Sequence, residues 1–238
     1  MILNPYRFAA VGGGGDPDFA SVVSLLHFDG ADASTTFTDQ KGKVWTPFGN
    51  AQIDTAQSKF GGASGLFDGA GDYLTTPSST DFDFGSGNFT VEMWIRTAQT
   101  AAYPTLLCRE WGGSPYSGGW SIFLNGAGGG PMEIYCADFS TGGPLLTSSS
   151  SAYRDSLQHH IAWVRNGNVH TLYIDGTSVA AATTAFSFAS VAKNLTIGND
   201  LTFGPRFYNG HIDDLRITKG VARYTANFTP PTAAFPDS

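Results

Sequence analysis

The feature that most constrains the fold is a series of short segments rich in β-branched and aromatic residues, bounded by Gly, Asn, Asp or Pro. Such segments predict strands, and no window of comparable length carries the i, i+3, i+4, i+7 pattern of an amphipathic helix. The predicted strands are 22–28, 43–48, 65–67, 89–96, 105–108, 120–124, 133–136, 159–165, 171–174, 195–197 and 211–218. Because all-β sandwiches often use 200 to 250 residues for one domain, the 238 residues predict a single all-β domain.

Alternation within segment 89–96 assigns its side chains to two faces. Successive side chains of a strand point to opposite sides, so residues of one parity share a face. The apolar set consists of Phe89, Val91, Met93 and Ile95. We expect this set to face the core of a sandwich.

Two dipeptides predict hairpins in the second half of the chain. Asn166-Gly167 and Asp175-Gly176 each stand between strand patterns. Asn-Gly and Asp-Gly favour tight hairpin turns because these turns require positive φ angles. The strands on either side should therefore form a meander.

Composition restricts the partners. The formal net charge is -7 and only 14% of residues are charged, so the chain lacks the broad positive surface that binds nucleic acid or anionic lipid. No stretch approaches the roughly 20 apolar residues of a membrane span, and the N-terminus lacks the pattern of a secretory signal. These observations predict no nucleic-acid or membrane partner, and folding in the cytoplasm of the cell that makes the protein.

The ends of the chain differ from its middle. Residues 1–20 predict a flexible arm, in which the glycines 12–15 act as a hinge behind an apolar tip. The tip is either an edge strand folded back on the domain or an anchor inserted into a neighbouring subunit. Residues 21–228 form the predicted sandwich. Residues 229–238, which contain three prolines, form a predicted extended tail that lies across the surface or joins a partner.

The two cysteines, Cys108 and Cys136, lie in predicted strands. Buried reduced thiols are expected of a chain without an export signal. A cross-strand disulfide is the alternative.

Five segments share a pattern of motifs and spacing with a known family. They are LLHFDG at 25–30, GGASGLFDG with DYL at 61–74, FTVEMWI at 89–95, HHIAWVR at 159–165 and GHIDDLRI at 210–217. Their order through most of residues 22–231 resembles the laminin-G-like, concanavalin A-like jelly-roll domains of lectin-like modules and phage structural proteins. The resemblance implies an all-β, two-sheet antiparallel jelly-roll sandwich.

The resemblance also implies a function. We expect a non-enzymatic structural protein, displayed on a virion or extracellular surface for subunit contact or host-surface adhesion. Its arm would bind other virion proteins, and a homo-trimer is the expected assembly. The alternative is a carbohydrate-binding module for a host-surface glycan, and the third reading is a glycoside hydrolase.

The sequence argues against catalysis. Retaining glycosidases need two carboxyl groups about 5 to 5.5 Å apart, one of them an acid and the other a nucleophile. The only glutamates are Glu92, Glu110 and Glu133, and they lack the Glu-x-Asp-x-x-Glu pattern of the hydrolases of this fold. We therefore expect no enzyme and no required cofactor.

The resemblance implies a structural calcium ion, which prefers carboxylate and carbonyl oxygens. Asp29 and Asp213 lie on the first and last predicted strands, which are close together in this fold, and Asp39 is a third candidate ligand. Alternatively, Asp29 caps a turn and Asp213 accepts hydrogen bonds from a neighbouring loop.

An aromatic, glycine-rich segment is the predicted ligand surface. Trp111, Tyr116 and Trp120 stand within ten residues that also contain four glycines. Their rings could stack on a sugar or on a partner side chain. In the alternative, Trp120 begins a strand and turns inward while Trp111 closes the end of the sandwich.

Overall fold

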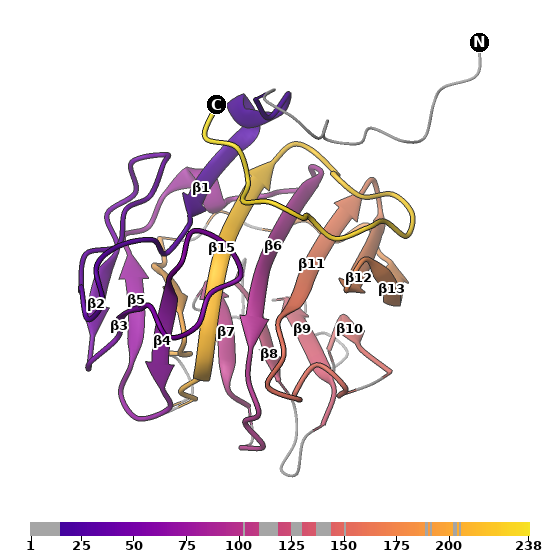
Figure 1. Ribbon diagram of the computed structural model, residues 1–238. Coiled ribbons are helices and arrows are strands. Elements are labelled where there is room, and N and C mark those ends of the chain that lie inside the picture. Colours follow the sequence, from indigo (N-terminus) through magenta and orange to yellow (C-terminus); the bar gives the residue numbers. More distant parts are fainter. Residues whose placement is uncertain are drawn as a thin grey trace.

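The computed structural model describes most of the chain after the N-terminal arm. The described residues are 15–101, 103–109, 119–124, 130–136, 144–149, 151–188, 190, 192–201, 204 and 206–238, with the backbone only at 135 and 136. Their strands form two antiparallel sheets that lie face to face (Figure 1). The predicted all-β, two-sheet jelly-roll sandwich is confirmed. No helix in the described part has the length and apolar character of a membrane span.

The first sheet has eight strands. Their order is β13 (Thr177–Thr183), β12 (Val169–Ile174), β11 (His159–Asn166), β6 (Phe89–Arg96), β15 (Asn209–Lys219), β4 (Ser64–Asp68) and β3 (Gln52–Asp54), and β1 (Val22–Leu26) also pairs with β15. Two 3-10 turns, η1 (Phe19–Ser21) and η2 (Thr80–Phe82), are the helical elements of the described residues.

The second sheet has seven strands. Their order is β10 (Leu146–Thr147), β9 (Met132–Cys136), β8 (Trp120–Leu124), β7 (Thr105–Arg109), β14 (Leu195–Ile197), β5 (Tyr73–Thr76) and β2 (Thr46–Phe48). The predicted strand ranges do not include β3, β5, β10 or β13, although the hairpin at Asp175-Gly176 implies a strand at the position of β13. The first three are short, and β13 is rich in Ala and Thr and so lacks a clear alternation.

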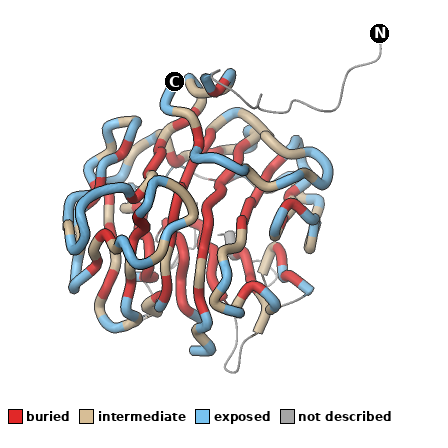
Figure 2. Tube along the Cα trace, in the orientation of Figure 1, coloured by how far each residue is buried: buried red, intermediate tan, exposed pale blue. Residues whose placement is uncertain are grey.

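One hydrophobic cluster joins the two sheets. The apolar set of β6 belongs to it, as predicted, and so do Trp163 of β11, and Leu107 and Trp120 of the seven-stranded sheet. The rings of Trp120 and Trp163 lie 5.6 Å apart across the sandwich. The centre of each sheet is therefore buried, and exposed residues gather in the loops (Figure 2).

Both predicted hairpins form. Asp175 and Gly176 connect β12 to β13 with φ angles of 49° and 73°, as a turn of type I′ requires. The other turn is displaced by one residue, because Asn166 still pairs with Val169. The two turn residues are therefore Gly167, with φ 60°, and Asn168.

The outer face of the eight-stranded sheet is also covered. Residues 220–238, named here the C-terminal strap, cross this face near one end of the strands (Figure 1). The strap packs Ala222, Tyr224 and Phe228 on Ala162, Val164 and Tyr173. Residues 55–62 cover another part of the face, where the Lys59 Nζ lies 3.9 Å from the ring centre of Trp94.

The strap is fastened at its end. The backbone N–H of Phe235 donates to Asp214 at 2.9 Å. The ring of His27 lies between Asp214, at 2.6 Å, and Asp237, at 2.7 Å. Burial opposes protonation of His27, but these two carboxylates outweigh it and raise its pKa to about 9. His27 is therefore charged at neutral pH and joins the strap to the sheet.

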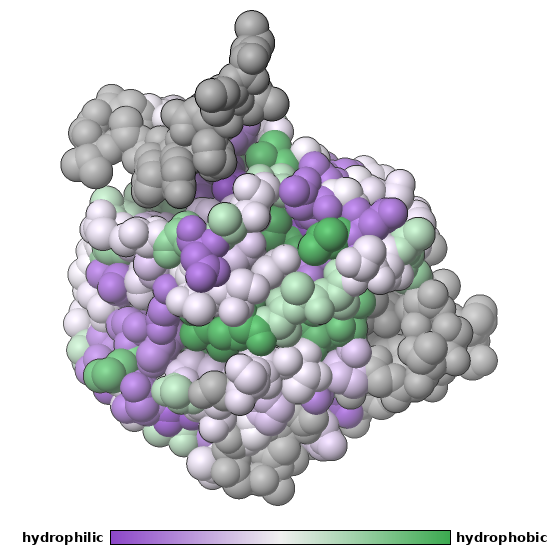
Figure 3. Space-filling view, turned by 90° about the vertical axis from the view of Figure 1, so that its right-hand side faces the viewer, coloured by the Kyte–Doolittle hydropathy of each residue, from purple (hydrophilic) through white to green (hydrophobic). Residues whose placement is uncertain are grey.

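The edge at β13 exposes part of the core. Turned to this side, the surface shows a hydrophobic band across its middle (Figure 3). Partly buried apolar residues of this edge pack against the core, and they are Ile174, Val179, Ala180, Ala182 and Phe186. An edge strand has no neighbour on one side, so it leaves such residues partly uncovered.

The backbone register excludes a disulfide between Cys108 and Cys136. Cys108 lies in β7 and Cys136 in β9, and β8 pairs with both strands. Two strands separated by a third are roughly 9 to 10 Å apart. Disulfide bonds need Cα atoms within about 7 Å of each other.

Candidate functional site

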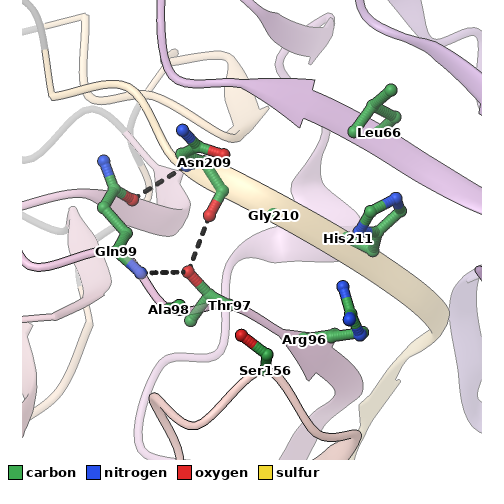
Figure 4. Close-up of a pocket in the computed structure, with 9 residues that line it drawn as sticks. All are labelled: Leu66, Arg96, Thr97, Ala98, Gln99, Ser156, Asn209, Gly210 and His211. Atoms are coloured by element: carbon green, nitrogen blue, oxygen red, sulfur yellow. Dashed lines mark hydrogen bonds between the residues drawn. The ribbon is translucent and has the colours of Figure 1, made fainter.

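A polar pocket lies at the end of the eight-stranded sheet where β6 ends and β15 begins. Its volume is about 320 Å³. The lining residues are Leu66, Arg96, Thr97, Ala98, Gln99, Ser156, Asn209, Gly210 and His211 (Figure 4). They come from β4, β6, β15, the segment after β6 and the segment before β11.

Hydrogen bonds hold the segment after β6 against the start of β15. The Thr97 hydroxyl donates to the Asn209 carbonyl at 2.6 Å, and the Asn209 N–H donates to the Gln99 side-chain oxygen at 2.8 Å (Figure 4). The Ser156 N–H donates to the Thr97 carbonyl at 3.0 Å. The pocket wall is thus preorganised by main-chain contacts.

Gly210 allows the close approach that shapes this wall. A Cβ atom at Gly210 would lie 2.3 Å from the Arg96 carbonyl oxygen and 2.7 Å from the Tyr208 hydroxyl. The buried Tyr208 hydroxyl donates to that same Arg96 oxygen at 3.1 Å. A side chain at position 210 would therefore push β15 away from β6.

Arg96 and His211 are directly opposite each other on neighbouring strands. The His211 Nε2 lies 2.9 Å from the Asp54 carboxylate. Burial lowers the pKa of His211, and the charge of Arg96 lowers it further against the effect of Asp54. His211 is therefore neutral near pH 7. If its Nε2 carries the proton toward Asp54, its Nδ1 is an acceptor, and this buried atom has no partner among the described residues.

The pocket offers both donors and acceptors. Within the described part of the chain, no hydrogen bond is made by the Arg96 guanidinium, the Asn209 amide or the Ser156 hydroxyl. Together with His211 Nδ1, these groups can bind a ligand that carries several hydroxyls. The lining contains no Phe, Tyr or Trp, so recognition here depends mainly on hydrogen bonds rather than on stacking.

Of the predicted aromatic platform, the structure describes Trp120. Trp111 and Tyr116 lie outside the described residues. Trp120 is 0% exposed, and its ring packs against Phe84 and Trp163 in the core. Trp120 is therefore unavailable to a ligand from solvent, because its position at the start of β8 turns it inward. This is the alternative that the sequence left open.

The two glutamates that the structure describes, Glu92 and Glu133, lie on different sheets. Glu92 is on the outer face of the eight-stranded sheet, where Arg216 Nη2 lies 2.8 Å away and the Tyr224 hydroxyl 2.7 Å away. Glu133 stands next to the core residue Ile134 and so faces outward from the seven-stranded sheet. Opposite outer faces are more than about 10 Å apart, too far for the catalytic pair. Glu110 lies outside the described residues.

The environment of Glu92 is that of a buried ion pair. Burial by itself would raise the pKa of Glu92, but the charge of Arg216 and the contact with His160 hold it well below its usual range. The carboxylate is therefore ionised and cannot serve as a general acid near neutral pH.

The three aspartates predicted to hold calcium do not form one site. Asp39 accepts hydrogen bonds from the Ser24 hydroxyl at 2.5 Å and from the Trp45 indole at 3.1 Å. Asp213 accepts from the backbone N–H groups of Lys59 and Phe60, at 2.6 and 3.1 Å. Among the described residues, no group of three or more His, Cys, Asp or Glu side chains could hold a metal ion.

Asp29 and Asp213 nevertheless interact. Burial raises the pKa of Asp213 to about 7, and the negative charges of Asp214 and Asp29 add to the shift. Calcium takes six to eight oxygen ligands, so this pair does not supply the predicted set. For Asp213, the alternative of a hydrogen-bonded loop contact describes the structure.

Sequence reasoning did not identify the pocket. The alternation in segment 89–96 puts Arg96 on the side away from the apolar set, and His211 stands inside the motif GHIDDLRI. The two residues are 115 positions apart, and only the register between β6 and β15 brings them together. Gly210, immediately before His211, was the one local sign that another part of the backbone comes close there.

Comparisons with solved structures show the same fold at low sequence identity. The binding domain of Paraclostridial Mosquitocidal Protein 1 superposes with a TM-score of 0.63 and 15% identity, covering 86% of this chain and 50% of that one. The binding domain of Botulinum Neurotoxin DC in complex with SialylT superposes with a TM-score of 0.61 and 15% identity, covering 86% of this chain and 50% of that one. This chain therefore spans about half the length of these toxin domains.

A third solved structure matches over nearly its whole length. It is Domain 4 of AbnA, a GH43 extracellular arabinanase from Geobacillus stearothermophilus, in complex with arabinotriose. Its TM-score is 0.59 with 19% identity, and the match covers 85% of this chain and 94% of that one. No curated protein matches this sequence.

A family model supplies the classification. The model Laminin_G_3, described as the concanavalin A-like lectin/glucanases superfamily, matches residues 68–223, which is more than half of the chain. The matched region runs from the end of β4 into the C-terminal strap and includes most of the pocket lining. The protein belongs to the Laminin_G_3 family of the concanavalin A-like superfamily.

Proposed function

We propose that this protein is a non-enzymatic binding module that recognises a glycan through the pocket between Arg96 and Asn209. The observation that carries the proposal is the preorganised wall of a pocket of about 320 Å³, whose donors and acceptors have no partner among the residues that the structure describes. Two structurally similar domains are described in complex with arabinotriose and with SialylT. The proposed function needs no cofactor and no reaction.

The test is a glycan array followed by titration calorimetry with the strongest ligand. We expect Asn209→Ala to weaken binding about tenfold, because the amide can make one or two hydrogen bonds to the ligand. The substitution should leave the fold intact, since the contacts of Asn209 to Gln99 and Thr97 are made by its backbone.

Asn168→Ala is the matched control. Asn168 is an exposed asparagine in the turn between β11 and β12, outside the pocket. Its variant should bind as the wild type does. The proposal would be wrong if no glycan on the array is bound, or if the wild type, Asn209→Ala and Asn168→Ala bind equally.

We also propose a setting for this module. The glycine-hinged arm and the low charge of the sequence support display on a virion or extracellular surface, attached to other virion proteins through the arm and assembled as a homo-trimer. Neighbouring capsid or tail genes, together with stoichiometric copies in purified particles, would support this setting. Absence of the protein from such particles would remove it.

A further inference from the structure

The Arg96 side chain differs from every other arginine in the described structure. The others all donate side-chain hydrogen bonds, and they are Arg109, Arg154, Arg165, Arg206, Arg216 and Arg223. Arg96 is partly buried, yet within the described residues its guanidinium has no hydrogen-bond or ion-pair partner. A partly desolvated guanidinium that makes no protein hydrogen bond retains its capacity to bind an anion.

The lining of the pocket does not neutralise this charge. None of the nine lining residues is acidic, although the whole chain has a net charge of -7. Acidic groups lie just outside the lining: the Asp54 carboxylate is 2.9 Å from the His211 Nε2, and Asp68 is opposite Asn209 in the register of β4 and β15. The lining itself therefore contributes one positive charge and no negative charge.

Among the nine lining residues, Arg96 carries the only permanent positive charge, and the next cation, Arg154, already donates to the Gln99 carbonyl at 2.6 Å. The neighbouring His211 is neutral near pH 7, for the reasons given above. A single planar guanidinium suits a single carboxylate, which it can bind with two parallel N–H···O bonds. A polyanionic chain would need a row of cations instead.

Size and polarity define the rest of the ligand. Ligand pockets range from about 300 to 1,000 Å³, and this one lies at the lower limit, so it suits one terminal sugar residue. Asn209 and Ser156 supply neutral polar groups beside Arg96 for the hydroxyls of that sugar. In Figure 4, Asn209 lies toward one end of the pocket and Arg96 toward the other.

We infer that the pocket binds an acidic terminal sugar whose carboxylate pairs with Arg96. This inference rests on the proposed glycan-binding function and specifies its ligand. The test uses an array printed with uronic-acid and sialic-acid termini, the methyl esters of the same glycans, their neutral counterparts and sulfated glycans.

We expect the wild type to bind the free acids about tenfold or more tightly than the methyl esters, because esterification removes the charge-assisted bonds. Arg96→Gln should abolish this preference, and Arg96→Lys should retain part of it, since lysine keeps the charge but not the two-pronged geometry. The Arg96→Gln protein should keep the wild-type Tm, which shows that the loss is not a loss of fold.

The possible failures are distinguishable. Equal binding of acids and esters, or an unchanged preference in Arg96→Gln, overturns the acidic-sugar inference. If Asn209→Ala still weakens binding in that case, the glycan-binding function stands. Binding to sulfated glycans alone also overturns the inference. If no glycan on the array is bound, both the glycan-binding function and the acidic-sugar inference are wrong.

Discussion

At the scale of single residues, His170 shows how burial can set a titration. Its side chain is 0% exposed, and its ring stacks on Trp163 with 5.9 Å between the ring centres. Neither ring nitrogen has a hydrogen-bond partner among the described residues. Burial, together with the nearby charge of Arg165, lowers the pKa of His170 to about 4. The folded protein therefore keeps this histidine neutral where the unfolded chain would protonate it.

We predict that His170→Phe reduces the acid sensitivity of the protein. The unfolded pKa is 6.5 and the folded pKa about 4, so the unfolded state binds more protons between these values and stability falls as the pH falls. Between pH 7.5 and 5.0, protonation of His170 in the unfolded state should lower the free energy of unfolding of the wild type by about 2 kcal/mol. Denaturant unfolding at the two pH values measures the loss, and an equal loss in both proteins would contradict the prediction.

At the scale of elements, the C-terminal strap turns one face of a sheet into interior. Beneath it, Arg216 bridges Glu92 and Asp16, at 2.8 and 3.1 Å. The ring of Phe235 lies 3.7 Å from the Arg216 guanidinium and packs on Val22 and Leu25 of β1. Buried charges destabilise a fold unless each one is paired and hydrogen-bonded. Phe235 of the strap covers Arg216 and so keeps these charges together.

We predict that Phe235→Ala lowers the free energy of unfolding by about 3 kcal/mol, since it removes a buried ring and leaves a cavity above Arg216. Thr232→Ala, at an exposed position of the same strap, should change it by less than about 0.5 kcal/mol. Urea unfolding of the two variants makes the comparison. If Phe235→Ala is as stable as Thr232→Ala, the strap does not contribute to the stability of the sandwich.

At the scale of the whole molecule, the two sheets depend on each other. Their inner faces form one cluster, and the contact between Trp120 and Trp163 is made across it. Neither sheet could expose its half of this cluster to water without a large loss of hydrophobic stabilisation. The sandwich is therefore one cooperative unit.

We predict a single unfolding transition. Far-ultraviolet circular dichroism reports the strands, and fluorescence reports the five tryptophans, which include Trp163 in one sheet and Trp120 in the other. The two signals should follow the same curve against denaturant concentration, as in a two-state transition. Separate midpoints would show that the sheets unfold independently.

The fold was predictable because its signals are local. Period-two alternation in β6 and the Asp-Gly turn after β12 each depend on a few adjacent residues, and both appear where expected. The hairpin implied β13, but its extent was not predicted because its alanines and threonines do not distinguish two faces. Of the candidate site, the sequence identified residue types suited to binding, but it did not identify the pocket.

The sequence by itself determined the sandwich, the inward face of β6 and the hairpins, since backbone geometry requires these patterns of neighbouring residues. Only the tertiary structure decided that Trp120 is buried, that Asp39 bonds to Ser24 and Trp45, and that Arg96 faces His211. These outcomes depend on which distant strands pair and in which register. Strand register is a property of the whole assembly of sheets, so no short segment of the chain contains it.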